Sequence, residues 1–239
     1  MSSSPYNPLG PAHYTPPNQG VELQTNPAKR VTVFFATREG HTQQIAERIM
    51  ADLRNHGFDV DIHDVRRPLQ FALSHYAAAV LAASVHAGDH EREMIQFVKD
   101  HRTELSRIPT AFISVTLSEA GAQRTDATPF EHAQFAADVD KMMNKFFEET
   151  EWRPEYAKPV AGALLYSKYN LLLRFIMKRI AKKAGALTDT SQDYDFTDWA
   201  DVDQFIDEFA PEIQGSAVPV DPSDGDAEST AGERIAIHV

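Results

Sequence analysis

The feature that most constrains the fold is an apolar run at residues 31–35, followed by a polar turn at 37–42 and then by apolar residues at helical spacing. The run is rich in β-branched and aromatic residues, which predicts a buried strand. Ile45, Ile49 and Leu53 then predict a helix with one buried face. A strand, a tight turn and a helix bring unpaired amide groups and the positive end of the helix dipole to one place. The segment therefore predicts an anion site that suits a phosphate group.

The turn itself carries the sequence Thr-x-x-Gly-x-Thr. Thr37 and Thr42 supply hydroxyl donors, and Gly40 lets the backbone approach a ligand closely. The glycine pattern of dinucleotide-binding folds and the Gly-Lys-Ser/Thr of nucleotide-triphosphate loops are both missing. The pattern resembles the phosphate loop of flavodoxins, which holds the phosphate of flavin mononucleotide (FMN). From these residues alone, an ordinary helix N-cap at Thr42 or nearby remains the alternative.

Strand-like and helix-like patterns alternate along the middle of the chain. Strands are predicted at 31–35, 58–62, 76–83, 108–117 and 158–166, and helices at 42–56, 90–105, 130–150 and 197–213. This alternation predicts an α/β fold with a doubly wound, five-stranded parallel sheet of order 2-1-3-4-5. Ligands of such sheets bind beyond the carboxyl ends of the strands, where the turns 37–42, 84–88 and 114–117 would meet. The polar stretch 118–129 is long enough to form a lid or a binding arm.

Composition bounds the domain organisation and the class of partner. Residues 1–29 are rich in proline and 214–239 in Gly, Ser, Pro and Asp, so we expect two flexible tails around one flavodoxin-like domain at 30–213. The formal net charge of −12 argues against nucleic-acid binding. The chain has no cysteine, no evident secretory signal and no apolar run of spanning length, which favours a cytoplasmic location. His86 and His90 lack a third convincing ligand, so no metal site is expected.

A basic stretch follows the fifth predicted strand. Residues 157–188 contain lysines and arginines but no acidic residue, and on a helical wheel apolar residues gather on one side. We expect an inserted basic amphipathic helix that contacts an anionic membrane surface. The alternative is a helix that packs its apolar side on the core and solvates its charges. The expected membrane-contact residues are Lys168, Leu171, Arg174, Phe175, Lys178 and Lys182.

Several segments, taken in order, resemble one family. They are 37–42, 83–85 with Gly88, 114–117, 152–154 (Trp-Arg-Pro), 161–164 with Tyr166 and Tyr169, the basic stretch, 188–190 and 197–199. In this order they resemble the flavodoxin-like, menaquinone-dependent protoporphyrinogen IX dehydrogenases of bacterial haem biosynthesis. The resemblance covers about residues 30–213, and the Trp-Arg-Pro segment and the basic stretch are more specific than the phosphate loop.

The resemblance implies an FMN-dependent oxidoreductase. It would oxidise protoporphyrinogen IX and pass the electrons to a membrane quinone, as a peripheral protein at the inner face of the membrane. Because the flavin carries the redox chemistry, no catalytic side chain is singled out. Two alternatives are an NAD(P)H:quinone reductase and a flavodoxin-like electron carrier without a substrate of its own.

The resemblance also implies the residues of the site. The expected FMN-binding residues are Thr37, Arg38, Glu39, Gly40, His41 and Thr42 at the phosphate, with Ser84, Val85, His86, Ala87, Gly88, Ser114, Val115, Thr116 and Leu117 beside the ring. Arg124 is expected to pair with a propionate of the porphyrinogen, because arginine suits carboxylates. Where relatives carry an aromatic residue after the third strand, this chain has His86 and Ala87, so the flavin ring would be more open.

Overall fold

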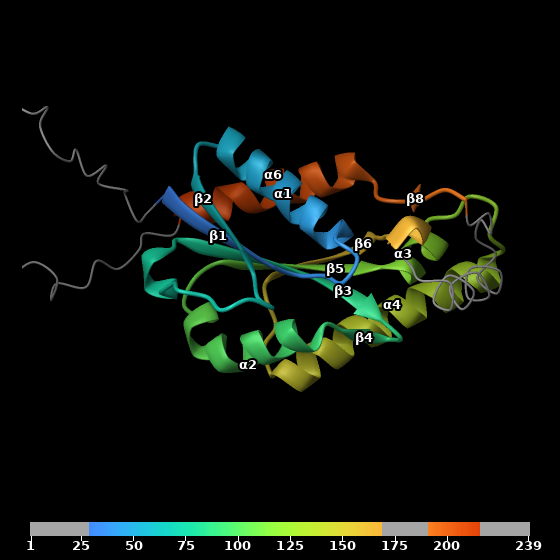
Figure 1. Ribbon diagram of the computed structural model, residues 1–239, viewed down its shortest axis with the longest axis horizontal. Helices are drawn as coiled ribbons and strands as arrows, with labels where there is room; N and C mark the ends of the chain where they lie inside the picture. The colour runs from blue at the N-terminus through green and yellow to red at the C-terminus, as the bar shows by residue number, and fades with distance from the viewer. Residues whose placement is uncertain (1–28, 169–190, 216–239) are drawn as a thin grey trace, which may run out of the picture.

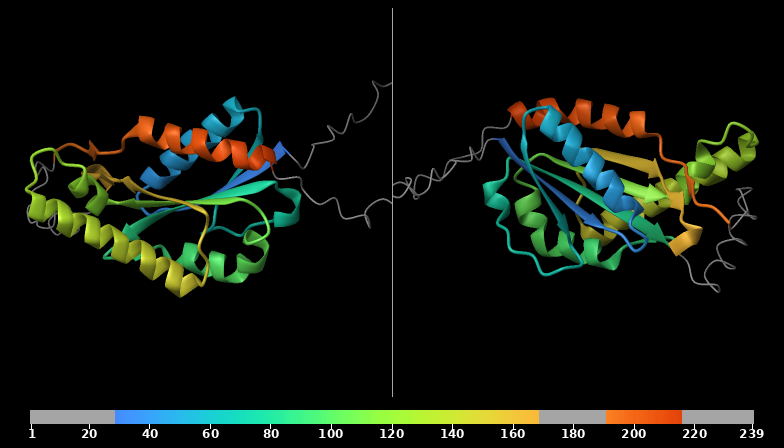
Figure 2. Two further views of the ribbon diagram at one scale, coloured as in Figure 1. Left: turned by 180° about the vertical axis from the view of Figure 1, so that it is seen from behind. Right: turned by 45° about the horizontal axis from the view of Figure 1, so that its top comes forward.

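The computed structural model describes residues 29–168 and 191–215, which form a twisted parallel sheet with helices on both faces (Figures 1 and 2). The main strands are β1 (Arg30–Ala36), β2 (Asp59–Asp64), β3 (Ala78–His86), β5 (Thr110–Thr116) and β6 (Tyr156–Ala161). Neighbouring strands are parallel and follow the order β2-β1-β3-β5-β6. This order is the predicted 2-1-3-4-5 arrangement, so the expected fold class is confirmed.

Two pairs of helices cover the sheet. They are α1 (His41–Asn55) with α6 (Trp199–Gly215) on one face, and α2 (Arg92–Leu105) with α4 (Pro129–Thr150) on the other (Figure 1). Successive strand residues point to opposite faces, so Val33 joins the core under α1 and α6 while Phe34 joins the core over α2 and α4. Because both faces are covered, the central strands β1, β3 and β5 read as largely continuous apolar runs, whereas the edge strand β2 alternates polar and apolar residues.

Part of the polar stretch 118–129, which was predicted to be a loop, is helical. A small helix, α3 (Leu117–Ala122), follows β5 directly, and the Thr116 hydroxyl accepts a hydrogen bond from the Ser118 amide at its start. α3 packs tightly on α4, since a Cβ added at Gly121 would lie 2.7 Å from the ring of Phe135. Gly121, one of the residues that suggested a loop, is the residue that allows this close contact.

Two very short ladders were not predicted. β4 (Asp89–His90) pairs antiparallel with the end of β3, so the helix predicted from residue 90 begins at Arg92. After β6 the chain forms β7 (Ala163–Leu164), which pairs with β8 (Tyr194–Asp195), and the 3-10 turn η3 (Tyr166–Lys168) follows. A second 3-10 turn, η2 (Leu73–His75), precedes β3. The fifth predicted strand, 158–166, is therefore divided at Gly162.

Several expectations lie outside the described residues. The inserted basic helix falls almost entirely on residues 169–190, and the two tails fall on 1–28 and 216–239. These remain predictions, as do the domain limits of 30 and 213, although α6 continues to Gly215. The first and the last described segments lie at the end of the sheet where the parallel strands begin (Figure 1). Within the described ranges, no helix combines the length and apolar character needed to cross a bilayer.

Candidate functional site

A cavity of about 520 Å³, here called the sheet-end cavity, lies at the carboxyl ends of the central strands. Its lining brings together all three predicted turns: Thr37, Arg38, Glu39, His41 and Thr42 after β1; Ser84, Val85, His86, Ala87 and Gly88 after β3; and Val115, Thr116 and Leu117 after β5. Gly162, Ala163 and Leu165 complete the lining and were not predicted. Their position just after the fifth strand was the available signal, because the same rule on strand ends applies to β6.

The phosphate turn leaves one hydroxyl without a partner. The N-cap of α1 is Gly40, whose φ is 94° and whose amide donates to the Thr37 hydroxyl at 3.1 Å. Thr42 therefore does not cap the helix; its side chain is 1% exposed, and its Oγ1 has no hydrogen-bond partner among the described residues. A buried hydroxyl without a partner is costly, and the first amides of a helix also lack carbonyl partners. This donor set fits a phosphate group.

Two residues predicted to bind FMN, His41 and Ser114, contact other protein side chains instead. His41 is buried, and its Nε2 lies 2.7 Å from the Thr197 hydroxyl and 3.4 Å from Asp195. Burial lowers the pKa of His41, although the Asp195 carboxylate opposes this effect. The imidazole thus links α1 to the segment before α6 and does not offer a charge to a phosphate. Ser114 is fully buried with its hydroxyl 2.8 Å from His90 Nε2, and it does not line the cavity.

Gly40 is also absent from the cavity lining, and its role is in the turn. Its positive φ is a conformation that glycine adopts at no steric cost, whereas other residues are strained there. The turn it forms sets the direction of α1 and thereby the direction of the first amides.

Arg38, Glu39 and His86 line the cavity and, with the buried Glu91, form a group of four charged residues, here called the Glu91 cluster. The Glu91 side chain is 1% exposed, with Arg38 Nε at 2.9 Å and His86 Nε2 at 3.1 Å from its oxygens. The Ser84 hydroxyl donates to Glu91 at 3.1 Å, and His86 Nε2 also lies 3.1 Å from Glu39. Arg38, expected to bind phosphate, is therefore paired with a carboxylate that the sequence analysis did not single out.

The residues of the Glu91 cluster shift each other's pKa values. Burial alone would raise the pKa of Glu91, but the neighbouring His86 and Arg38 lower it to about 2. Burial alone would lower the pKa of His86, but Glu39 and Glu91 raise it to about 9. At neutral pH the cluster therefore carries two positive and two negative charges.

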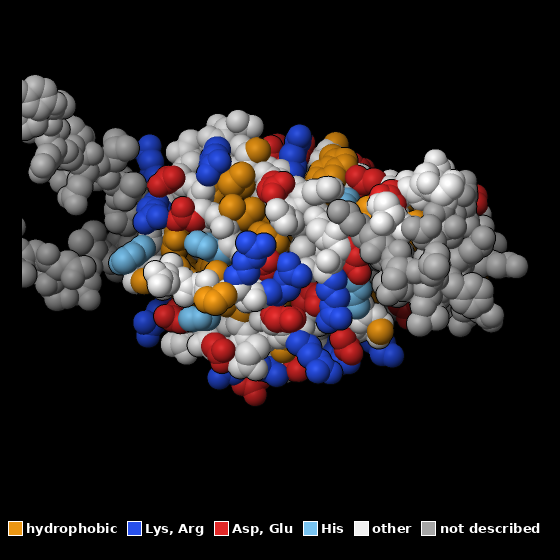
Figure 3. All heavy atoms as spheres, viewed as in Figure 1, with side chains coloured by type: hydrophobic (Ala, Val, Ile, Leu, Met, Phe, Trp, Pro, Cys, Tyr) orange, Lys and Arg blue, Asp and Glu red, His pale blue; other side chains and the backbone are white. Residues whose placement is uncertain are grey.

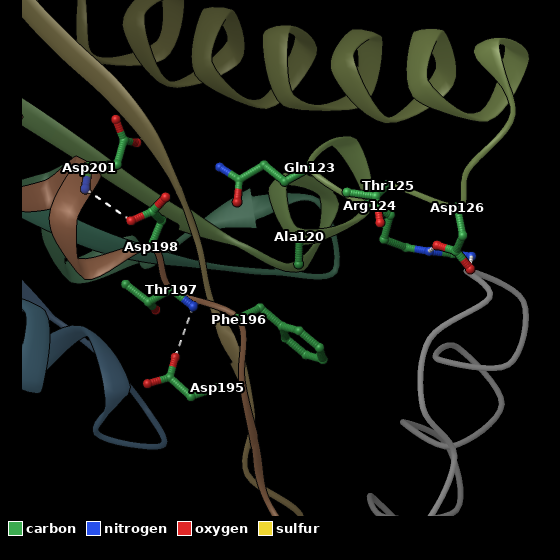
Figure 4. A pocket seen from close by; sticks show the side chains of 10 residues that line it. All are labelled: Ala120, Gln123, Arg124, Thr125, Asp126, Asp195, Phe196, Thr197, Asp198 and Asp201. Atoms are coloured by element: carbon green, nitrogen blue, oxygen red, sulfur yellow. Dashed lines mark hydrogen bonds and ion pairs between the residues drawn. The ribbon is translucent and has the colours of Figure 1, made fainter.

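A second cavity of about 770 Å³, the aspartate pocket, lies between the end of α3 and the start of α6 (Figure 4). Its lining includes Arg124, the predicted propionate partner, together with four aspartates: Asp126, Asp195, Asp198 and Asp201. The Arg124 guanidinium donates two hydrogen bonds of 3.0 Å to Asp126. Arg124 thus lies in a pocket other than the sheet-end cavity, and its charge is balanced by Asp126.

Comparison with known proteins identifies the family. The Flavodoxin domain family matches residues 32–191. Protoporphyrinogen IX dehydrogenase (quinone) of Escherichia coli strain K12 is 32% identical over 182 residues, which cover 76% of this chain and 94% of that protein. The chain belongs to this flavodoxin-like family. Protoporphyrinogen IX dehydrogenase (quinone) of Leishmania major is 31% identical over 179 residues, which cover 74% of this chain and 73% of that protein.

Among solved structures, a flavodoxin mutant from Pseudomonas aeruginosa is similar with a TM-score of 0.44 and 13% identity, covering 78% of this chain and 99% of that one. Throughout the described part of the chain, no group of three or more His, Asp and Glu side chains is arranged to hold a metal ion.

Proposed function

We propose that the protein is an FMN-dependent protoporphyrinogen IX dehydrogenase that delivers electrons to a membrane quinone. The observation that carries the proposal is the sheet-end cavity with the buried, unpartnered hydroxyl of Thr42 at its phosphate end. The relatives named protoporphyrinogen IX dehydrogenase, which this chain matches over nearly their whole length in the bacterial case, support the substrate class.

The FMN phosphate would lie at the start of α1, between the hydroxyls of Thr37 and Thr42. When bound, the flavin would supply the transfer of electrons, while the chain supplies binding and orientation. The ring would lie beside the turn after β3 and the end of β5. None of the described residues that line the cavity is Phe, Tyr or Trp. A ring that is not enclosed by aromatic side chains leaves room for a large reductant such as a porphyrinogen.

Arg124 would bind a carboxylate of that substrate by exchanging partners. Its bidentate geometry with Asp126 is the geometry in which a guanidinium also binds a propionate. Asp126 is exposed, so its release into water costs little. Leu117 lines the sheet-end cavity and Ala120, on the same short helix, lines the aspartate pocket, so the two cavities are neighbours.

The basic stretch would hold the protein at the inner face of the membrane. Leu165 lines the sheet-end cavity, and Lys168, the first of the expected membrane-contact residues, follows three residues later. A membrane contact at Lys168, Leu171, Arg174, Phe175, Lys178 and Lys182 would bring the quinone close to the flavin.

The test is an anaerobic reduction experiment on the purified chain with bound FMN. Protoporphyrinogen IX should bleach the flavin absorbance, and a menaquinone analogue should restore it. Bleaching by NADH or NADPH alone would indicate a nicotinamide-dependent quinone reductase instead. Bleaching by neither donor would leave an electron carrier, and a chain that folds but binds no FMN would overturn the whole proposal.

A further inference from the structure

His86 occupies an unusual position in the sheet-end cavity. It is the last residue of β3, it lines the cavity, and its side chain is 34% exposed. Nε2 lies between two carboxylates, one from the phosphate turn and one from the start of α2, at 3.1 Å from each. Neither of these contacts has hydrogen-bond geometry, so the imidazole is held between the two carboxylates by charge. The ring lies beside two carboxylates and also lines the cavity.

The charges around His86 hold it in the protonated form. The groups that face it are Glu39 and Glu91, and Arg38 contacts Glu91 from the far side. Asp89 pairs with His86 along the backbone ladder, but its carboxylate bonds to Lys145. With a charged His86 the Glu91 cluster is neutral, whereas with a neutral His86 it carries one net negative charge beside the cavity.

We propose that His86, as a fixed imidazolium, stabilises the reduced form of FMN over the oxidised form. This inference rests on the proposed function, since it requires FMN in the sheet-end cavity. The oxidised ring is uncharged, and the fully reduced ring carries negative charge near neutral pH. A cation in a partly buried cavity therefore lowers the free energy of the reduced ring more than that of the oxidised ring. His86 is a positioning and electrostatic residue here, and the raised pKa of its imidazole is consistent with this role.

The experiment compares wild type with His86→Gln, which keeps a polar side chain but cannot carry charge. Dissociation constants for oxidised and reduced FMN, and the midpoint potential of bound FMN, are measured anaerobically at pH 7. We expect the affinity for reduced FMN to fall about tenfold more than that for oxidised FMN. For a two-electron couple, this factor lowers the midpoint potential by about 30 mV.

Two further variants separate charge from structure. His86→Lys restores a cation and should return the potential toward the wild-type value. Glu39→Gln removes one carboxylate from His86 and should raise the potential, the opposite of His86→Gln. A structural role would weaken both redox forms equally and leave the potential unchanged, which would overturn the inference while FMN binding by the wild type still upholds the proposed function. A wild type that binds no FMN would instead overturn the proposed function itself.

Discussion

At the scale of single residues, the site depends on the hydroxyl of Thr42. It is buried without a partner at the start of α1, whereas most buried polar groups in proteins are hydrogen-bonded. We expect Thr42→Val to weaken FMN binding by about 10–100-fold, because a hydrogen bond to a charged group contributes about 1.5–3 kcal/mol. A fluorescence titration of FMN measures this loss.

Thr32 provides the matched control. It is also fully buried, and its hydroxyl also lacks a partner among the described residues, but it lies on β1 and does not line the cavity. Thr32→Val should leave the FMN dissociation constant unchanged and should not destabilise the fold, because it removes an unsatisfied hydroxyl. Equal effects of the two variants on FMN binding would contradict the assignment of Thr42 to the phosphate.

His90 predicts a pH dependence of stability. It is 4% exposed and lies against the rings of Phe112 and Phe146, and burial lowers its pKa from 6.5 to about 4 although Asp89 and Glu91 oppose this. Between pH 4 and pH 6.5, His90 is protonated in the unfolded chain but not in the folded chain. Stability from this residue is therefore complete above about pH 6.5 and is lost as the pH falls through 4, by about 3 kcal/mol in total.

Urea unfolding of wild type and His90→Gln between pH 4 and 8 tests this. Glutamine can keep the hydrogen bond to Ser114 but does not titrate in this range, so the difference between the two proteins should shrink or reverse as the pH falls. Parallel stability curves for the two proteins would show that His90 is not the titrating group.

Some residues of the site could be predicted from the sequence, and others could not. The positions of Thr37, Thr42 and the turn after β3 followed from the strand–turn–helix pattern, since they depend on local geometry. The directions of His41 and Arg38 did not, because their partners, Thr197 and Glu91, are 156 and 53 residues away in the chain. Glu91 itself read only as an acid near a helix start, and nothing in the sequence distinguished it from a solvated residue.

At the scale of elements, periodicity located every long helix and strand, because each buries one or both faces over many residues. It missed β4 and β8 and joined β7 to β6 in one predicted strand, because each of these three has only two residues and therefore no measurable period. It also missed α3, whose six residues are fewer than two full turns. These short elements form or border the walls of the two cavities.

The β3–β4 hairpin carries a stability prediction. Its turn residues Ala87 and Gly88 both have positive φ, 53° and 88°, as a type I′ turn requires. For alanine this conformation costs about 1–2 kcal/mol. We expect Ala87→Gly to raise the free energy of unfolding by about 0.5–1 kcal/mol, after the entropic cost of glycine in the unfolded chain is subtracted. Urea denaturation measures the change.

Gly88→Ala is the opposite substitution in the same turn. A Cβ at Gly88 would have no atom within 4 Å, so Gly88→Ala creates no steric clash. Any change in stability would therefore come from the backbone conformation alone. We expect a loss of about 1–2 kcal/mol. If both substitutions shift stability in the same direction, backbone conformation does not control this turn.

At the scale of the whole molecule, the parallel sheet and its strand order could be predicted, because alternating strands and helices permit few topologies. The sequence shows how charge is distributed along the chain, but it could not predict which charged side chains the fold brings together, such as Arg38 and Glu91. The chain has a net charge of −12, yet its basic stretch concentrates positive charge within a short segment. On the face seen in Figure 3, acidic and basic side chains are interspersed.

The membrane proposal belongs to this scale. We expect the wild type to co-sediment with anionic vesicles and Lys178→Glu with Lys182→Glu to remain in solution with FMN still bound, because each basic residue near an anionic surface contributes about 1 kcal/mol. Lys29→Glu with Lys141→Glu is the control, since both lysines are exposed and the change in net charge is the same. If neither double variant co-sediments with the vesicles, binding responds to the total charge of the protein. If the wild type does not co-sediment, the membrane proposal is wrong.

Glu91 has a consequence for how the cavity behaves before a ligand arrives. Its single carboxylate is held by Arg38 from the segment after β1 and by Ser84 and His86 from β3, so the two sides of the cavity are joined through one buried group. Such a site is preorganised: little loop ordering accompanies association, and little conformational entropy is lost. The free protein should therefore resist proteolysis at these turns almost as well as the flavin-bound form.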